Sequence, residues 1–124
     1  MNTIEETIKL AGFGRKRVMK KQIKIIRKNL HEGEKLLGVA ASFPKPMEQL
    51  FVSNNKVIVH KIEGLTDNKS IEIPISTIKS VKVKSADFGA EIKVSAPNNS
   101  ATVVEIPLDV AKEIKKLIDS LRKA

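Results

Sequence analysis

The hydrophobic residues change their spacing twice along this 124-residue chain, and these two changes restrict the fold more than any other feature. They recur at helical intervals over residues 15–30, at every second position from residue 36 onward, and again at helical intervals over residues 110–121. A period of 3.6 places apolar side chains on one face of a helix, and a period of two places them on one face of a strand. The chain is therefore predicted to be one mainly β domain with a helical segment at each end.

Seven short strands are predicted between the two helical segments. Turn-forming residues separate them, among them Asn54-Asn55 and the Pro-Asn-Asn-Ser run at 97–100. Ile71, Ile73 and Ile75 alternate with polar residues or proline, which is typical of a sheet with one buried face and one wet face. Seven strands in so short a stretch indicate a small barrel or sandwich. The predicted strands are 36–42, 48–53, 56–62, 70–75, 78–84, 90–96 and 101–106.

The C-terminal segment is predicted to be an amphipathic helix that follows Pro107. Asp109 is expected to cap this helix, and the apolar stripe on it is expected to cover one open end of the barrel. The stripe consists of Val110, Ile114, Leu117, Ile118 and Leu121.

The N-terminal segment, residues 1–31, is predicted to contain two helices. Thr3 and Glu6 have the spacing of a capping box for a first helix over Ile4–Ala11, and Gly12-Phe13-Gly14 is expected to form a hinge. The second helix runs from Arg15 to Leu30, and Gly33 can take the left-handed conformation after it. Its apolar stripe consists of Met19, Ile23, Ile26 and Leu30, flanked by Val18 and Ile25. The opposite face carries the candidate binding residues Arg17, Lys20, Lys21, Lys24, Arg27 and Lys28.

The positive charge is concentrated in this N-terminal segment. Of the net charge of +9, residues 1–31 contribute +7, from nine Lys and Arg against two Glu. Such asymmetry indicates contact with anionic lipid, nucleic acid or an acidic protein, and the alternative is a solvated helix face that keeps the protein soluble. The four Phe residues, with no Tyr or Trp, offer few platforms for base stacking, so contact with nucleic acid would be with phosphates alone.

No catalytic, cofactor-binding or metal-binding residue is predicted. The chain has no cysteine, which excludes disulfides and agrees with a cytoplasmic setting, and no apolar run is long enough to span a membrane. His31 and His60 are expected at the surface, and Glu32 and Glu34 are expected to be solvated. Ser53 precedes a tight turn and is expected to hydrogen-bond the backbone rather than to attack a substrate.

Several local motifs, in their order and spacing, resemble the bacterial branch of the pleckstrin-homology (PH) fold, the YokE-like PH domains. Glu34 to Leu37 resembles that family's Glu-rich start of the first strand, and Leu50 to Val59 resembles its first hairpin, with Ser53 and Lys56 in place of Thr and Arg. Ile73 to Val81 and Phe88-Gly89 resemble two later segments. The resemblance covers about residues 32–122 and implies a PH-like seven-stranded barrel or sandwich over 32–124, capped by a C-terminal helix.

The resemblance also implies what kind of protein this is. PH-like domains bind rather than catalyse, so we expect a non-catalytic interaction or scaffold module that binds a protein partner or assembles into a homo-oligomer. Strand 101–106 is the expected open edge for self-assembly. The alternative is peripheral binding to an anionic membrane, or sequence-blind binding to nucleic acid, through the basic helix. The loop at 43–48 has one Lys and one Glu, so specific phosphoinositide binding is not expected.

Overall fold

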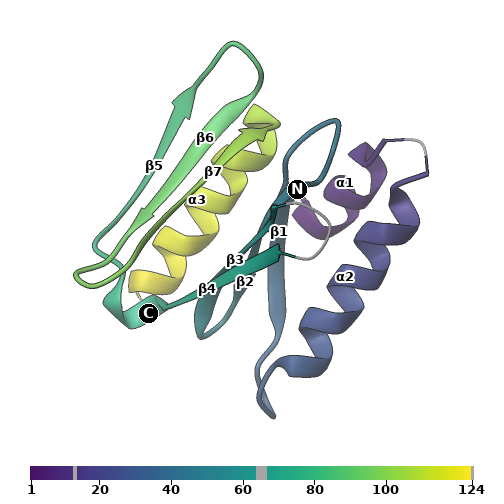
Figure 1. Ribbon diagram of the computed structural model, residues 1–124. Coiled ribbons are helices and arrows are strands. Elements are labelled where there is room, and N and C mark those ends of the chain that lie inside the picture. Colours follow the sequence, from purple (N-terminus) through teal and green to yellow (C-terminus); the bar gives the residue numbers. More distant parts are fainter. Residues whose placement is uncertain (13, 64–66, 124) are drawn as a thin grey trace.

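Two antiparallel sheets and three helices make up the computed structural model, which describes residues 1–12, 14–63 and 67–123. The first sheet has the strand order β1-β2-β3-β4 and the second has the order β5-β6-β7 (Figure 1). The mainly β fold with a C-terminal helix and an N-terminal helical segment is therefore confirmed. The elements are α1 (Thr3–Leu10), α2 (Lys16–Asn29), β1 (Leu36–Ala41), β2 (Glu48–Ser53), β3 (Lys56–Glu63), β4 (Asp67–Pro74), a 3-10 turn (Ile75–Thr77), β5 (Ser80–Ser85), β6 (Ala90–Ser95), β7 (Ser100–Ile106) and α3 (Leu108–Lys123).

The main core lies between the facing sides of the two sheets and α3. Leu50 and Val59 are paired across β2 and β3, and both are buried in this core together with Ile92 of β6. Helix α3 contributes the predicted stripe, of which Val110, Ile114 and Ile118 are buried. The helix thus covers the core as expected from the sequence.

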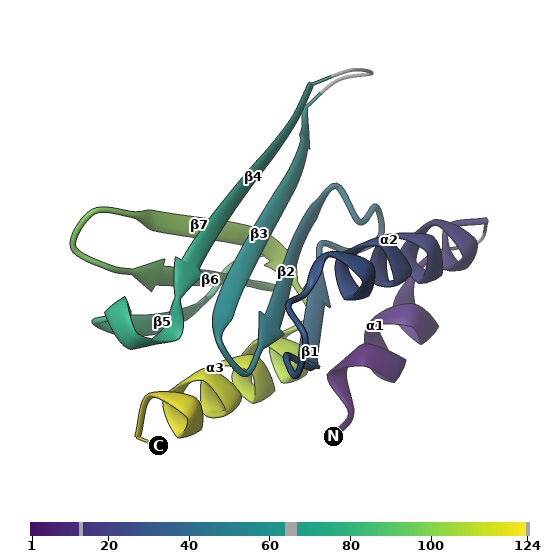
Figure 2. The ribbon, with the colours of Figure 1, turned by 90° about the horizontal axis from the view of Figure 1, so that it is seen from below.

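Helices α1 and α2 cover the outer face of the first sheet and form a second core there (Figure 2). Met19 and Ile23 of α2 are 0% and 2% exposed and belong to the same apolar cluster as Phe51 and Ile58 of the sheet. The first sheet is therefore buried on both faces. This explains why consecutive residues of β2, and not only alternate ones, are buried.

The predicted capping box at the start of α1 is wrong. Asn2 caps the helix, because its Oδ1 accepts hydrogen bonds from the backbone N–H groups of Ile4 and Glu5. Thr3 is buried in the helix instead, and its Oγ1 accepts a hydrogen bond from the N–H of Val39 at the edge of the first sheet. The Thr3 side chain, which the sequence predicted as the cap of α1, instead attaches α1 to β1.

Some predicted boundaries shift for local reasons. A 3-10 turn separates β4 from β5, so the predicted strands 70–75 and 78–84 become Asp67–Pro74 and Ser80–Ser85. Helix α3 begins at Leu108, which puts Asp109 in its first turn and not at the cap. Gly33 has a φ of +82°, as expected for the turn after α2. The predicted hinge Gly12-Phe13-Gly14 includes Phe13, which lies outside the described residues.

Candidate functional site

The outer side of α2 carries a concentrated positive charge. The buried stripe fixes the rotation of the helix, and α2 contains no acidic residue. Within the described part of the chain, no ion pair neutralises its exposed cations. We call the six exposed candidate residues the α2 basic surface, and their role in binding stays a prediction: Arg17, Lys20, Lys21, Lys24, Arg27 and Lys28.

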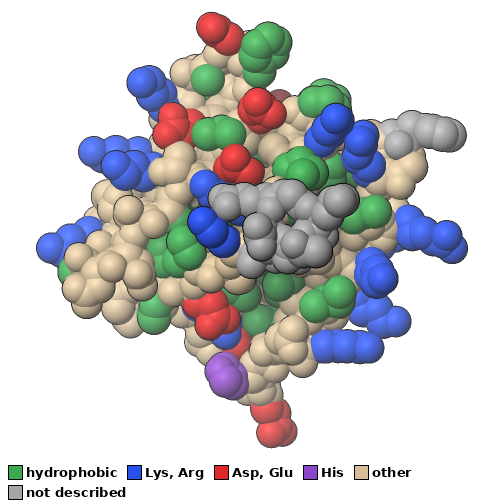
Figure 3. Space-filling view, viewed as in Figure 1, with side chains coloured by type: hydrophobic (Ala, Val, Ile, Leu, Met, Phe, Trp, Pro, Cys, Tyr) green, Lys and Arg blue, Asp and Glu red, His purple; other side chains and the backbone are tan. Residues whose placement is uncertain are grey.

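Two apolar side chains lie beside the α2 basic surface. Val18 is 49% exposed and Ile25 is 41% exposed, although the sequence placed both on the flank of the buried stripe. They are seven residues apart, so they share one side of the helix. Figure 3 shows Lys and Arg side chains along the right-hand edge of the molecule, over α2, with hydrophobic side chains next to them. This side of α2 can therefore contact a surface that is both anionic and partly apolar.

A polar contact joins α2 to the sheet beneath it. Nδ1 of His60 on β3 lies 3.1 Å from Nε2 of Gln22 and 3.3 Å from Oε1 of the buried Gln49. Burial lowers the pKa of His60 and so favours the neutral ring. His60 is half-buried between helix and sheet, whereas His31 is exposed as predicted. His60 thus contacts both the helix and the sheet and helps to position α2.

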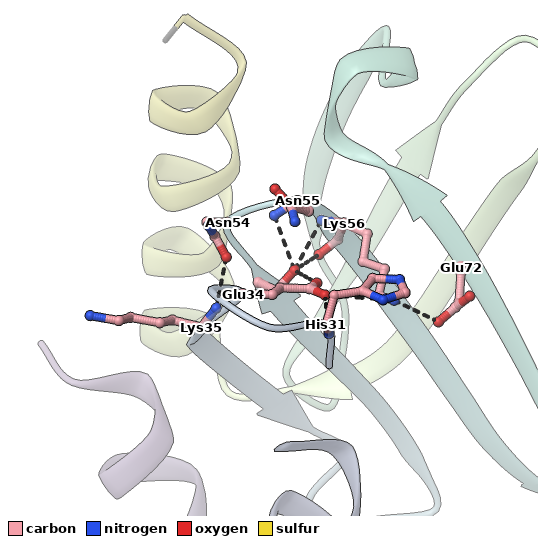
Figure 4. Close-up of polar contacts among 8 residues, drawn as sticks. His31, Glu34, Lys35, Asn54, Asn55, Lys56 and Glu72 are labelled. Atoms are coloured by element: carbon pink, nitrogen blue, oxygen red, sulfur yellow. Dashed lines mark hydrogen bonds and ion pairs between the residues drawn. The ribbon is translucent and has the colours of Figure 1, made fainter. Parts of the chain in front are cut away.

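The prediction that Glu34 is solvated is wrong, because its carboxylate is the centre of a buried polar network (Figure 4). It accepts hydrogen bonds from the hydroxyl of Ser53 and from the backbone N–H of His31, the latter at 3.0 Å. The Nζ of Lys56 lies 3.9 Å from Oε1 of Glu34 and 3.2 Å from the exposed Glu72. Glu32, by contrast, is exposed as predicted.

The environment keeps Glu34 ionised. Burial raises the pKa of this carboxyl, but the hydrogen bonds from Ser53 and His31 and the charge of Lys56 outweigh burial and leave the pKa below its ordinary value. Ser53 also accepts hydrogen bonds from the N–H groups of Asn55 and Lys56, at 3.1 and 3.0 Å, as expected for a residue of a tight turn. The network therefore ties the β2–β3 turn to the segment before β1. The Ser53 hydroxyl and the Glu34 carboxylate that accepts its hydrogen bond are both buried, which favours a structural role for the pair.

A second basic surface, which the sequence analysis missed, lies on the sheet formed by β5, β6 and β7. Lys82 and Lys84 of β5 and Lys93 of β6 are exposed, and Lys82 lies directly opposite Lys93. In Figure 3, a separate group of Lys and Arg side chains is visible at the left, where this sheet lies. Summing the charge over residues 32–124 concealed this surface, on which a single acid of β5 and β6, Glu91, lies opposite Lys84. The alternation of Val81, Lys82, Val83 and Lys84 could have revealed it.

A hollow of about 530 Å³ adjoins the start of β5 and lies against α3. Ile75, Ile78 and Val81 give it an apolar part. The rest of the lining is polar or charged and comes from Ser76, Lys79 and Ser80 and from four charged residues of α3. The hydrogen bond from Lys115 is the main reason why the pKa of Asp119 lies below its ordinary value, and Arg122 also bonds to this carboxylate. The one carboxylate that lines the hollow is thus already paired.

Two other kinds of site are absent from the part of the chain that the structure describes. No group of three or more His, Cys, Asp or Glu side chains there is placed to hold a metal ion. None of the described helices is both long and apolar enough to cross a membrane.

The comparisons with known proteins concern the fold. A family model described as "Bacterial PH domain" matches residues 30–123. The structure is similar to a pleckstrin homology domain from Shewanella amazonensis SB2B, with a TM-score of 0.62 and 17% identity over 83% of this chain and 86% of that one. It is also similar to a DUF1696 family protein with a pleckstrin-homology domain from Shewanella loihica PV-4, with a TM-score of 0.59 and 14% identity over 83% of this chain and 95% of that one. No curated protein matches.

Proposed function

This chain belongs to the bacterial PH domain family, and we propose that it is a non-catalytic interaction module that attaches to an anionic membrane surface through the α2 basic surface. One observation carries the proposal. Six exposed Lys and Arg side chains lie on a helix that is packed on the sheet and contains no acid. A cluster of cations without internal partners repels itself, and an external anion relieves that repulsion.

The packing of α2 makes this surface a fixed one. Met19 and Ile23 are buried, and leaving such side chains in water would forgo about 1.5–3 kcal/mol each. The hydrogen-bonding contact between Gln22 and His60 adds a polar attachment. Because the helix need not order itself on binding, each cation contributes without the entropic cost of folding a disordered segment.

The exposed apolar side chains favour a lipid surface over nucleic acid. Val18 and Ile25 flank the cations on α2, and Phe43 and Met47 of the β1–β2 segment are 48% and 43% exposed. Helices that lie in the membrane interface combine basic and apolar residues in this way, whereas a phosphate backbone gives apolar side chains nothing to bury against. The charge makes this a general anionic contact, without a dedicated phosphoinositide site.

Vesicle co-sedimentation tests the proposal. Changing Lys20, Lys21, Lys24 and Lys28 to Gln should weaken binding to vesicles of phosphatidylcholine and phosphatidylglycerol by roughly two to three orders of magnitude, since each cation near an anionic membrane contributes about 1 kcal/mol. Gln keeps helix propensity and leaves the buried stripe unchanged. Pure phosphatidylcholine vesicles should bind neither protein.

A matched control removes the same charge elsewhere. Changing Lys82, Lys84, Lys93 and Lys112, which are also exposed, to Gln should leave vesicle binding nearly unchanged. Equal weakening by both quadruple variants would show that net charge, and not the α2 basic surface, is responsible. Two results together would favour nucleic acid as the partner. The first is that V18S/I25S binds vesicles with the affinity of the parent, and the second is that duplex DNA displaces the parent protein from vesicles when DNA and lipid are present at equal phosphate concentration.

A further inference from the structure

The strand β5 has a free edge on the side away from β6. It is the outermost strand of its sheet, and within the described residues Ser80–Ser85 form hydrogen bonds only with β6. The sequence predicted strand 101–106 as the open edge, and β7 is indeed the other outermost strand. However, Glu105 O accepts a hydrogen bond from Phe43 N–H, and Val104 N–H donates one to Glu48. Of the two outermost strands of this sheet, β5 is therefore the one whose described residues form no hydrogen bond on the free side.

The two sides of β5 differ in chemistry. Lys82 and Lys84 lie on the exposed side of the strand, while Val81 and Val83 lie on the side that faces the core and α3. The hollow described above adjoins this second side, with Val81 in its lining. An additional strand placed along β5 would follow the same alternation, with one side chain beside the lysines and the next toward the hollow.

We propose that the free edge of β5, together with the adjoining hollow, binds an extended segment of a partner protein in which acidic and aliphatic residues alternate. The acidic side chains would lie beside Lys82 and Lys84, and the aliphatic ones would lie over the apolar lining of the hollow. Main-chain hydrogen bonds to β5 provide affinity, and the alternating side chains provide specificity. This proposal is independent of the membrane proposal for α2.

The charge around β5 identifies the partner as acidic. Within the part of the chain that the structure describes, Lys82, Lys84 and Lys93 form no ion pair. Lys82 and Lys93 lie directly opposite each other across β5 and β6, which is unfavourable for like charges. Glu91, the only acid of these two strands, lies opposite Lys84, so their exposed face keeps an excess of positive charge. At the end of α3, Lys123 adds a further exposed cation to the lining of the hollow.

The same lysines make a second copy of this chain a poor occupant. Two β5 edges pairing with each other would bring Lys82 and Lys84 of both copies together. Lysines on edge strands commonly prevent such pairing. Protection of the edge alone is therefore the alternative role of these lysines, and it predicts no affinity for an extended acidic peptide beyond general charge attraction.

A labelled peptide can separate the two roles. The probe is a fluorescein-labelled peptide of alternating Glu and Val, measured by fluorescence anisotropy with the whole protein at constant salt. We expect saturable binding that becomes about tenfold weaker in K82Q/K84Q, which corresponds to the loss of two exposed ion pairs. A peptide of the same sequence that is N-methylated at every residue keeps the charge but can donate no main-chain hydrogen bond, and it should bind the parent protein at least as weakly as the unmodified peptide binds K82Q/K84Q.

Two controls make the result decisive. K9Q/K35Q removes the same charge from two exposed positions outside both proposed sites and should bind the peptide as the parent does, and thermal melting checks that both variants are folded. If the N-methylated peptide binds the parent protein as tightly as the unmodified one, or if K9Q/K35Q weakens binding as much as K82Q/K84Q, the attraction is general and the lysines only protect the edge. Absence of any peptide binding would overturn the proposal equally, and none of these outcomes bears on vesicle binding through α2.

Discussion

Glu34 shows how one buried carboxylate can hold two parts of the chain together. It lies in the segment before β1, yet its partners Ser53 and Lys56 belong to the turn between β2 and β3 (Figure 4). A carboxylate buried in this way is stable only because its hydrogen-bond acceptors are occupied. Removing its charge should loosen the attachment of the turn.

We therefore predict that Glu34→Gln lowers the free energy of unfolding by roughly 1–3 kcal/mol near neutral pH, the usual cost of disturbing a buried hydrogen-bonded group. The pKa of Glu34 is lower in the folded protein than the ordinary value of 4.5. The stabilisation is therefore present above pH 4.5 and is lost as the pH falls through the lower pKa of the folded state. Urea unfolding from neutral to acidic pH should show the difference between parent and variant shrinking on acidification.

Glu32 provides the control for this measurement, because it is exposed and only two residues away. Glu32→Gln should have the same free energy of unfolding as the parent at every pH. A difference between parent and Glu34→Gln that stays constant down to the acid limit would mean that the lost charge is not the cause.

At the scale of elements, α2 joins a structural face and a charged face on one helix. Ile23 and Ile25 differ by only two positions, yet Ile23 is 2% exposed and Ile25 is 41% exposed. The first belongs to the second core, and the second lies beside the α2 basic surface. Substituting each of these two residues tests how much the packing of α2 on the sheet contributes to the free energy of unfolding.

We predict that Ile23→Ala costs about 2–4 kcal/mol in unfolding free energy, because it removes buried methyl groups and leaves a cavity over the sheet. Ile25→Ala should change stability by less than about 0.5 kcal/mol, as expected for an exposed site. Chemical denaturation of both variants checks this. If both variants lost the same unfolding free energy, α2 would have to be rotated about its axis so that Ile23 and Ile25 are equally buried.

These elements also show what the sequence could and could not predict. The buried face of α2 and the covering face of α3 follow from helical spacing, since residues three and four apart share a face whatever lies opposite. The burial of Glu34 depends on Ser53, which is 19 residues away, and no local pattern records such a contact. The basic surface on β5 was missed because a summed charge does not record on which side of a strand each lysine lies.

At the scale of the whole molecule, the arrangement of exposed apolar side chains bears on self-assembly. Phe88, in the turn between β5 and β6, is 79% exposed, and it lines a hollow of about 290 Å³ together with Val104 of β7, which is 37% exposed. A large apolar side chain this exposed suits a contact between proteins. The homo-oligomer predicted from the sequence can use this place even though β5 repels a second copy.

We predict that light scattering at micromolar concentration gives a species larger than the 13.7 kDa chain, and that Phe88→Ser shifts it toward 13.7 kDa. Val18→Ser provides the control, because it removes an exposed apolar side chain on α2, outside this area, and it should scatter as the parent does. A parent protein that scatters only as the 13.7 kDa species would exclude self-assembly under these conditions.

The α2 basic surface and the lysines of β5 lie at opposite ends of the molecule (Figures 1 and 2). A ligand bound at one of these places therefore leaves the other place unobstructed. If both proposals hold, the protein is bivalent and works as an adaptor that recruits an acidic protein segment to a membrane. The local concentration of that segment at the lipid surface would then rise without any change in the affinity of either contact.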